Sequence, residues 1–246
     1  MPLPSKPLKA VFPIVSVTDK VPRLSYSFQG TGFFINSDGT FLTAKHVLGN
    51  INTAERGKYS AVMLDLSANE AIPKKISDLK FSEQFDIALG HVEGVGEIQP
   101  LNLAKENAPM NRDVLTVEFS GTHSEQIADE IRALIFTPYF RKGHVICYYK
   151  STFPENIPTT CIDLSFPALK GASGAPVIVE ADGCVIGMVV GNVERELLPA
   201  QLEKVTEDGK YTEEIRYFLP TGKAISWAHL AEFVKSVRSV DSLDQK

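Results

Sequence analysis

The feature of this 246-residue sequence that most limits its fold is a series of short apolar runs. Each run has the length of a single β-strand, and glycine, proline, asparagine or aspartate separates one run from the next. The runs are Ala10–Val17, Gly32–Ile35, Ala61–Leu66, Ile87–Val92, Asp113–Phe119, Gly143–Tyr149, Ala175–Val179 and Val185–Val190. This pattern predicts a protein built mainly from short β-strands.

Two polar segments between these runs are typical of hairpin turns. Asn36–Thr40 contains the pair Asp38-Gly39 and lies between an apolar run and the short strand that we expect at Phe41. The segment Ala181-Asp182-Gly183 repeats the Asp-Gly pair further along the chain. Because glycine readily adopts the positive φ that tight hairpins need, both segments predict antiparallel pairing of their flanking strands.

A helical period is clear only near the end of the chain, within Ala224–Ser239. Apolar residues in this segment fall mostly three or four positions apart, as on one face of a helix. They are Ile225, Trp227, Leu230, Phe233, Val234 and Val237. We therefore expect one C-terminal helix on an otherwise β protein, with Trp227 as a core anchor and His229 at the surface.

The stretch Asn192–Arg216 is polar and interrupts the pattern of apolar runs. Its acidic residues are Glu194, Glu196, Glu203, Glu207, Asp208, Glu213 and Glu214, and its basic residues are Arg195, Lys204, Lys210 and Arg216. A solvated insertion and a loop that controls substrate entry both fit this composition.

Charge and composition exclude several classes of protein. The hydrophobic fraction of 43% is that of an ordinary globular chain. The net charge of −5 offers no basic surface for phosphate binding, so we expect no nucleic-acid partner. No stretch approaches the roughly 20 apolar residues of a membrane helix, so we expect no membrane partner.

Cysteine usage and the N-terminus bear on the cellular compartment. Cys147, Cys161 and Cys184 are odd in number and share no CxxC spacing, so we do not expect a disulfide framework. The segment Met1–Lys20 begins with prolines and lacks the pattern of a signal peptide. Together these features favour a cytoplasmic location, while a periplasmic or secreted location stays open if a signal peptide has been removed.

No spacing in the sequence is typical of a metal or cofactor site. The histidines His91, His123, His144 and His229 show no ligand spacing with the cysteines or with one another. The segment Gly94-Val95-Gly96 lacks the lysine of a phosphate-binding loop. We expect no metal and no cofactor.

Ser173 lies in the segment Gly171-Ala172-Ser173-Gly174-Ala175-Pro176, just before a strand. Its small neighbours allow a tight turn that exposes the hydroxyl and lets nearby N–H groups point into one cavity. The final glycine of the GxSxG nucleophile elbow is missing, and a strand follows instead of a helix, which weakens an α/β-hydrolase interpretation. Alone, the segment is equally compatible with a structural turn.

A histidine and an aspartate stand at strand ends earlier in the chain. His46 follows the strand that contains Phe41 and Leu42, and Asp86 opens the strand Ile87-Ala88-Leu89. Each residue alone fits a structural role, but the order His, Asp, Ser is that of one nucleophilic triad and differs from the subtilisin and α/β-hydrolase orders. With these three local motifs, the sequence resembles the trypsin-like, chymotrypsin-fold serine peptidases.

The resemblance covers Phe28–Val234 and is strongest to the bacterial HtrA-like, disulfide-free branch. Gly30–Ile35 and Tyr217–Pro220 are similar to that branch, and no PDZ-like region is expected because the chain ends at Lys246. The resemblance implies an all-β fold of two six-stranded antiparallel β-barrels with a C-terminal helix. The barrels would span residues 8–108, with the histidine and aspartate, and 109–222, with the serine, followed by the helix and tail at 223–246.

The resemblance also implies a role for each site residue. Ser173 would attack the scissile carbonyl, His46 would act as general base and acid, and Asp86 would orient the imidazole. The N–H groups of Gly171 and Ser173 would form the oxyanion hole. Substrate would bind along the strand near the serine, at Val190, Gly191 and Asn192.

Several positions depart from the family pattern. Ala175 replaces a usual glycine, Lys45 replaces a usually small residue, and Ala172 stands where relatives carry Asp or Asn. The hydroxyl residue that often supports the catalytic aspartate is not identifiable in Gly187–Gly191. These differences bear on rate and regulation more than on reaction type.

The sequence therefore predicts a serine endopeptidase that hydrolyses protein or peptide substrates through an acyl-enzyme intermediate. Two alternatives stay open. One is a pseudo-peptidase that uses the cleft expected between the two barrels as a peptide-binding or protein-binding module. The other is a dedicated processing or signalling protease that acts on a single partner or answers to a regulator.

Overall fold

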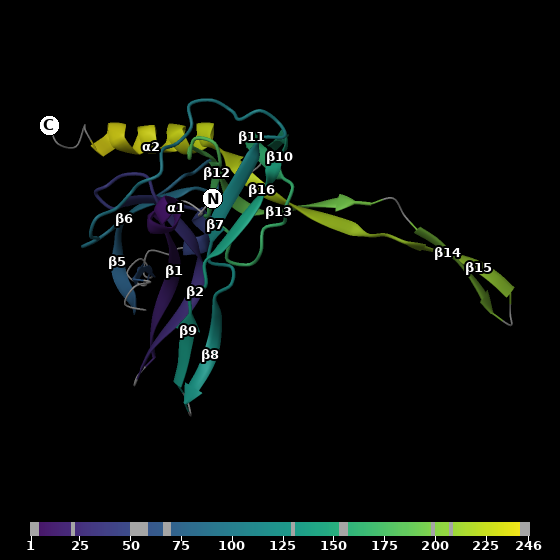
Figure 1. Ribbon diagram of the computed structural model, residues 1–246, viewed down its shortest axis with the longest axis horizontal. Coiled ribbons are helices and arrows are strands. Elements are labelled where there is room, and N and C mark those ends of the chain that lie inside the picture. Colours follow the sequence, from purple (N-terminus) through teal and green to yellow (C-terminus); the bar gives the residue numbers. More distant parts are fainter. Residues whose placement is uncertain are drawn as a thin grey trace.

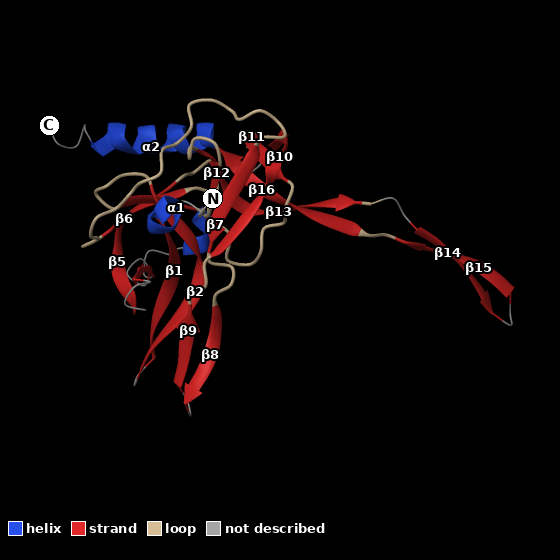
Figure 2. Cartoon of the chain, viewed as in Figure 1, coloured by secondary structure: helices blue, strands red, loops and turns tan. Residues whose placement is uncertain are grey.

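A computed structural model describes residues 5–20, 23–49, 59–65, 70–128, 131–152, 157–197, 200–206 and 209–241. Strands dominate this part of the chain, and a long helix lies at its C-terminal end (Figure 2). Twelve of the strands close into two six-stranded antiparallel barrels, which confirms the predicted fold class.

The first barrel closes in the strand order β1-β2-β3-β6-β5-β4. Its strands are β1 (Val11–Lys20), β2 (Arg23–Phe34), β3 (Thr40–Thr43), β4 (Tyr59–Asp65), β5 (Glu70–Phe81) and β6 (Ala88–Val92), and the short helix α1 (Ser5–Ala10) precedes them. Inside the barrel, the ring of Phe12 lies 4.6 Å from that of Phe34 and 5.3 Å from that of Phe41, measured between centroids. All three rings are buried, so aromatic packing fills this core.

The second barrel closes in the strand order β10-β11-β16-β13-β12-β7. Its strands are β7 (Asp113–Glu118), β10 (Tyr139–Ser151), β11 (Thr159–Leu164), β12 (Pro176–Val179), β13 (Val185–Glu196) and β16 (Phe218–Ser226). Aliphatic side chains fill its core, among them Val114, Val145, Ile162, Val177 and Val189. A separate hairpin of β8 (His123–Ala128) and β9 (Ile131–Ile135) extends from this half of the chain.

Both expected hairpin turns are present. Gly39 has φ +102°, and Asp38 Oδ1 accepts the N–H of Thr40 at 2.8 Å, between the paired strands β2 and β3. Gly183 has φ +75°, between the paired strands β12 and β13. The Asp-Gly pairs therefore mark both turns correctly.

The polar stretch that begins at Asn192 interrupts the apolar runs but not the strands. β13 continues to Glu196 and pairs with β16 as far as Phe218. Beyond them, β14 (Ala200–Thr206) pairs with β15 (Gly209–Ile215), and together these strands form an arm that projects from the second barrel (Figure 1). A two-stranded ribbon with both faces in solvent needs no apolar run, so hydrophobic pattern alone does not reveal it.

The expected C-terminal helix is α2 (Trp227–Asp241), which packs through the buried side chains of Leu230 and Val234. Two expectations about its residues are wrong. Trp227 is only half-buried, and its Nε1 donates a hydrogen bond to Asn107 Oδ1 at 3.0 Å, so it is not a core anchor. The side chain of His229 is 13% exposed, so it is not a surface residue.

Cys147, Cys161 and Cys184 are free thiols, and burial raises the pKa of Cys161. Among the helices in the described residues, none combines the length and apolar character needed to cross a membrane.

Candidate functional site

His46 and Asp86 form a close hydrogen-bonded pair on the first barrel. His46 lies in the short 3-10 helix η1 (Lys45–Leu48), and Asp86 lies in the loop before β6. Asp86 Oδ2 is 2.6 Å from His46 Nδ1, and Asp86 Oδ1 accepts the main-chain N–H of His46 at 2.9 Å. A proton on Nδ1 leaves Nε2 of the neutral ring free to accept another. The histidine side chain is 48% exposed, so a substrate can reach it.

Strand pairing explains why two residues so distant in sequence meet. β3 and β6 are antiparallel neighbours with Thr43 opposite Ala88, so the end of β3 and the start of β6 lie side by side. Lys45 adds a second connection, because its Nζ donates to the main-chain oxygen of Ser82 at 3.0 Å. Ser82 Oγ in turn accepts the N–H of Phe85 at 3.0 Å. Lys45 therefore ties the histidine segment to the loop that carries the aspartate.

The C-terminal helix supports the same loop through His229. The rings of His229 and Phe85 lie 4.2 Å apart between centroids, and Phe85 is 7% exposed. His229 Nε2 accepts the main-chain N–H of Thr160 at 2.9 Å. Burial lowers the pKa of His229, which favours the neutral ring that this hydrogen bond requires. The sequence gives no sign of this contact, because its partners come from other segments and leave no local signal.

Ser173 lies in a tight turn between β11 and β12. The N–H of Ala175 donates to the oxygen of Ala172 at 2.9 Å, which closes the turn around the serine. The N–H of Gly174 donates to the oxygen of Val189 at 2.8 Å, and the N–H of Val189 donates to the oxygen of Ala175 at 2.9 Å. These bonds fix the turn against β13.

The serine turn also packs against the first barrel. The N–H of Thr31 donates to the oxygen of Ser173 at 2.9 Å, and Thr31 Oγ1 donates to the oxygen of Gly171 at 2.8 Å. A Cβ atom at Gly174, where φ is +87°, would lie 2.0 Å from the oxygen of Thr31 and 2.4 Å from Thr43 Oγ1. Only glycine fits there. Because Thr43 ends β3, this contact places the serine turn beside the strand that leads to the histidine.

Two main-chain amides of the turn have no acceptor in the described part of the chain. They are the N–H groups of Gly171 and Ser173. Gly171 has φ +95°, and a Cβ atom there would lie 2.3 Å from Phe28 Cε1, so the backbone is held close to that ring. Unpaired amides beside a nucleophile are suited to stabilising negative charge on a substrate oxygen.

The sequence shows no hydroxyl residue to support Asp86, and no hydroxyl group bonds to its carboxylate among the described residues. The carboxylate accepts hydrogen bonds only from His46 in this part of the chain. The described hydrogen bonds also include none between the side chains of Ser173 and His46. In the absence of substrate, catalytic hydrogen bonds are often long and shorten only when substrate binds.

The predicted substrate strand lies beside the serine turn, at a register shift between Val189 and Gly191 in β13. Asn192 on this strand makes two side-chain hydrogen bonds to one residue. Its Oδ1 accepts the N–H of Ala168 at 2.7 Å, and its Nδ2 donates to the oxygen of Ala168 at 2.8 Å. Asn192 therefore links β13 to the segment ahead of the serine, a positioning role that the sequence did not indicate.

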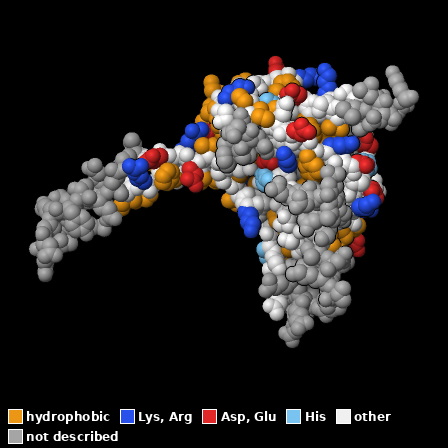
Figure 3. All heavy atoms as spheres, turned by 180° about the vertical axis from the view of Figure 1, so that it is seen from behind, with side chains coloured by type: hydrophobic (Ala, Val, Ile, Leu, Met, Phe, Trp, Pro, Cys, Tyr) orange, Lys and Arg blue, Asp and Glu red, His pale blue; other side chains and the backbone are white. Residues whose placement is uncertain are grey.

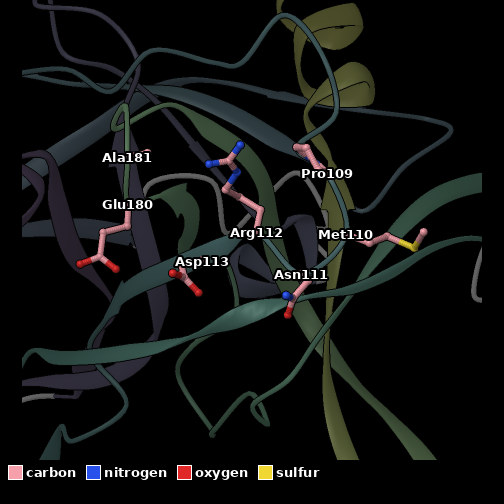
Figure 4. A pocket seen from close by; sticks show the side chains of 7 residues that line it. All are labelled: Pro109, Met110, Asn111, Arg112, Asp113, Glu180 and Ala181. Atoms are coloured by element: carbon pink, nitrogen blue, oxygen red, sulfur yellow. The ribbon is translucent and has the colours of Figure 1, made fainter.

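A hollow of about 400 Å³ lies elsewhere on the second barrel (Figure 4). Its lining residues are Pro109, Met110, Asn111, Arg112, Asp113, Glu180 and Ala181. Glu180 Oε1 is paired with Lys142 Nζ at 2.6 Å, and the lining contains neither a histidine nor a nucleophile. No cluster of histidine, cysteine or acidic residues in the described part of the chain could hold a metal ion.

Comparison with known families gives one match, to the trypsin-like peptidase domain, over residues 30–188. This range contains His46, Asp86 and Ser173. A search of curated protein sequences finds no match.

Solved structures of similar fold include several proteases. The active form of the Rv3671c protease from M. tuberculosis has 18% identity and a TM-score of 0.60, and the match covers 93% of this chain and 79% of that one. The HtrA-type protease AlgW with a decapeptide has 13% identity and a TM-score of 0.66, with coverage of 96% and 66%. The MamO protease domain from Magnetospirillum magneticum has 13% identity and a TM-score of 0.59, with coverage of 94% and 98%.

Proposed function

This chain belongs to the trypsin-like peptidase family and is a serine endopeptidase, and we propose that His46, Asp86 and Ser173 are its catalytic triad. The observation that carries the proposal is the 2.6 Å contact between Asp86 Oδ2 and His46 Nδ1. The His46–Asp86 pair lies next to the serine turn, which packs on Thr31 and Thr43. The proposal adds a hydrogen bond between Ser173 Oγ and His46 Nε2, formed when substrate is bound.

The steps follow from this arrangement. His46 Nε2 takes the proton of Ser173 Oγ as the oxygen bonds to the scissile carbonyl carbon, and Asp86 stabilises the imidazolium that forms. The amides of Gly171 and Ser173 bind the oxyanion, a contribution of about 3–4 kcal/mol per donor in comparable sites. His46 then donates its proton to the leaving amine, and water hydrolyses the acyl-enzyme by the same steps in reverse.

Peptide or protein substrates are supported by the AlgW structure, which was solved with a decapeptide. The alternative is a pseudo-peptidase that binds such chains without cutting them. Both functions require an accessible site, and the 48% exposure of the His46 side chain is compatible with either.

Substitution of the serine distinguishes an active peptidase from a pseudo-peptidase. We expect Ser173→Ala and His46→Ala each to lower kcat/KM for a peptide substrate by several orders of magnitude, with the thermal melting temperature nearly unchanged. Ser37→Ala is the matched control, because Ser37 is exposed in the turn between β2 and β3. Near-normal turnover by Ser173→Ala would reject the assignment, and no turnover by the folded wild-type protein would favour the pseudo-peptidase.

A further inference from the structure

A buried carboxylate ends strand β7 in the second barrel. Glu118 is the last residue of β7, and only 1% of it is exposed. Its Oε1 accepts a hydrogen bond from Arg141 Nε at 2.8 Å and another from Ser120 Oγ at 2.7 Å. Thr116 Oγ1 lies 3.4 Å from its Oε2. We call these four residues the Glu118 cluster, and the reaction steps given above use none of them.

The ion pair in this cluster is shielded from solvent. Figure 3 shows acidic and basic side chains side by side at the surface, where solvent weakens their attraction. Lys142 and Glu180 form such a pair, with side chains 55% and 42% exposed. For Arg141 and Glu118 the values are 23% and 1%. Because a buried carboxylate is strongly destabilising without its partners, the cluster holds the end of β7 in one arrangement.

The segment that follows Glu118 contacts Gly171 of the serine turn. A Cβ atom on Gly171 would lie 3.5 Å from Ser120 Cα and 2.3 Å from Phe28 Cε1. Ser120 and Phe28 are therefore two walls around the Cα atom of this glycine. Because Glu118 binds the hydroxyl of Ser120, the buried carboxylate fixes the position of one wall.

Phe119 gives the same segment a second connection to Gly171. The N–H of Phe119 donates to Thr31 Oγ1 at 3.3 Å, and that hydroxyl donates to the main-chain oxygen of Gly171 at 2.8 Å. Phe119 is 1% exposed, so its ring is fixed in the core. The residues from Glu118 to Phe119 and Ser120 thus reach Gly171 both by direct packing and through a threonine hydroxyl.

The amide of Gly171 depends on such contacts from outside the serine turn. The peptide group after Gly171 is held at both ends, because Thr31 binds its oxygen and the N–H of Ala172 donates to the oxygen of Leu169 at 3.0 Å. The N–H of Gly171 belongs to the preceding peptide group, which a glycine lets rotate with little steric resistance. Ala172 is fully buried and has no polar side chain that could anchor it. Packing against the Cα atom of Gly171 therefore limits this rotation.

We propose that Glu118 is a positioning residue for the oxyanion hole, which holds Ser120 against Gly171 so that the N–H of Gly171 points at the oxygen of the scissile carbonyl. The proposal rests on the proposed function, because it takes Ser173 as the nucleophile. Glu118 acts through hydrogen bonds and touches no reacting atom. Its effect belongs to the transition state, in which that oxygen carries negative charge, more than to substrate binding.

Ser120→Ala is the central test, because it cuts the link from the carboxylate to the wall and leaves Arg141 on Glu118. We expect kcat for a peptide substrate to fall about tenfold, with KM within about twofold of wild type. Thr116→Val is the matched control. It also removes a hydroxyl beside Glu118, but from a side chain with no described hydrogen bond to the serine turn. Its kcat should stay within about twofold of wild type.

Inhibitors separate the transition state from the ground state. With a peptide aldehyde, Ser173 Oγ bonds to the aldehyde carbon and its proton passes to His46, which leaves a negative oxygen in the oxyanion hole. The corresponding peptide alcohol binds without forming that bond. Ser120→Ala should weaken the aldehyde about tenfold and the alcohol by no more than about twofold. Thr116→Val should change neither inhibition constant.

Two substitutions of Glu118 distinguish its hydrogen bonds from its charge. Glu118→Leu removes every acceptor, and kcat should fall about 100-fold, as on loss of one oxyanion donor. Glu118→Gln keeps an oxygen for Ser120 and Arg141 and offers an N–H to Thr116, so it should recover kcat to within about fivefold of wild type. A glutamine variant as slow as the leucine variant would overturn positioning by hydrogen bonds. Where Glu118→Leu does not fold because Arg141 has lost its partner, Ser120→Ala against Thr116→Val decides.

Failure of the positioning role and failure of the proposed function give different results. Peptide cleavage that Ser173→Ala abolishes and Ser120→Ala leaves within about twofold of wild type overturns the positioning role alone. Equal losses of kcat in Ser120→Ala and Thr116→Val overturn it as well, because they indicate a structural cluster only. A folded wild-type protein that cleaves no peptide rejects the proposed function, and the positioning role falls with it.

Discussion

His46 and Ser173 lie on opposite barrels, and the structure holds them in different ways. The histidine is held by side-chain chemistry, through the 2.6 Å contact with Asp86 and the 2.9 Å bond from its own N–H to the same carboxylate. The serine is held through its main-chain oxygen, which accepts the N–H of Thr31, and by the absence of a side chain at Gly174.

Because of this difference, we expect substitutions in the two halves of the site to affect rate and stability differently. The histidine half depends on one carboxylate at the surface of the first barrel, so a change there should alter rate more than stability. The serine half is part of the contact between barrels, where one added methyl group meets backbone atoms. An added side chain there should alter stability and rate together.

Among the changes that test this comparison, the largest effect on rate is expected for Asp86→Asn. The amide can no longer hold the imidazole in the required tautomer, and the same substitution in a comparable triad lowers kcat about 10⁴-fold. The free energy of unfolding should change by no more than about 1–2 kcal/mol, because the site is partly exposed. Steady-state kinetics and denaturant titration measure the two quantities. A large loss of stability would mean that the two halves of the site are not held differently.

The next effect, on stability and rate together, is expected for Gly174→Ala. The new Cβ would meet the oxygen of Thr31 at 2.0 Å in a backbone with φ +87°. Overpacking and the positive φ together should cost about 3–5 kcal/mol of folding stability. Displacement of the serine should lower kcat/KM about 100-fold.

Gly183→Ala is the matched control for this prediction. Gly183 also has a positive φ, +75°, but a Cβ atom there meets nothing within 4 Å. Its cost should therefore be only that of the backbone conformation, about 1–2 kcal/mol, with normal kinetics. Equal losses for Gly174→Ala and Gly183→Ala would show that the contact between the barrels is not the constraint.

The smallest effect is expected for His229→Gln, which tests the support of the Asp86 loop by helix α2. Burial lowers the pKa of His229 in the folded protein, so the unfolded chain takes up a proton first as pH falls below about 6.5. Stability therefore decreases in that range, with Glu232 opposing the shift and Lys150 adding to it. Glutamine can still accept the N–H of Thr160 but does not titrate, so the variant should lose less stability between neutral and mildly acidic pH.

Thermal melts across that pH range measure the difference between wild type and variant. At alkaline pH, where the histidine is neutral in both states, the two proteins should be almost equally stable. A pH dependence that is identical in the two proteins would remove His229 as a contributor.

The sequence predicts the fold where burial leaves a pattern. Apolar runs and Asp-Gly turns indicate the barrel strands and two hairpins, and helical spacing indicates α2. Strand β5 (Glu70–Phe81) is mostly exposed, and the arm has solvent on both faces, so neither leaves an apolar run. The order His, Asp, Ser points to the candidate site because each motif is local.

The contacts that position the site are not local, and the sequence does not show them. The stacking of His229 on Phe85 and the paired hydrogen bonds from Asn192 to Ala168 each join different segments. Their residue types are common at surfaces and in loops, so only the folded arrangement reveals their role.

Reaction with a fluorophosphonate probe tests the triad most directly, because the probe bonds only to an activated serine. Intact-mass analysis of the labelled wild-type protein should show one adduct per chain, and peptide mapping should place it on Ser173. The adduct should be absent from Ser173→Ala and should form orders of magnitude more slowly in His46→Ala. A folded wild-type protein that stays unlabelled, or that carries the adduct on another serine, would contradict the account.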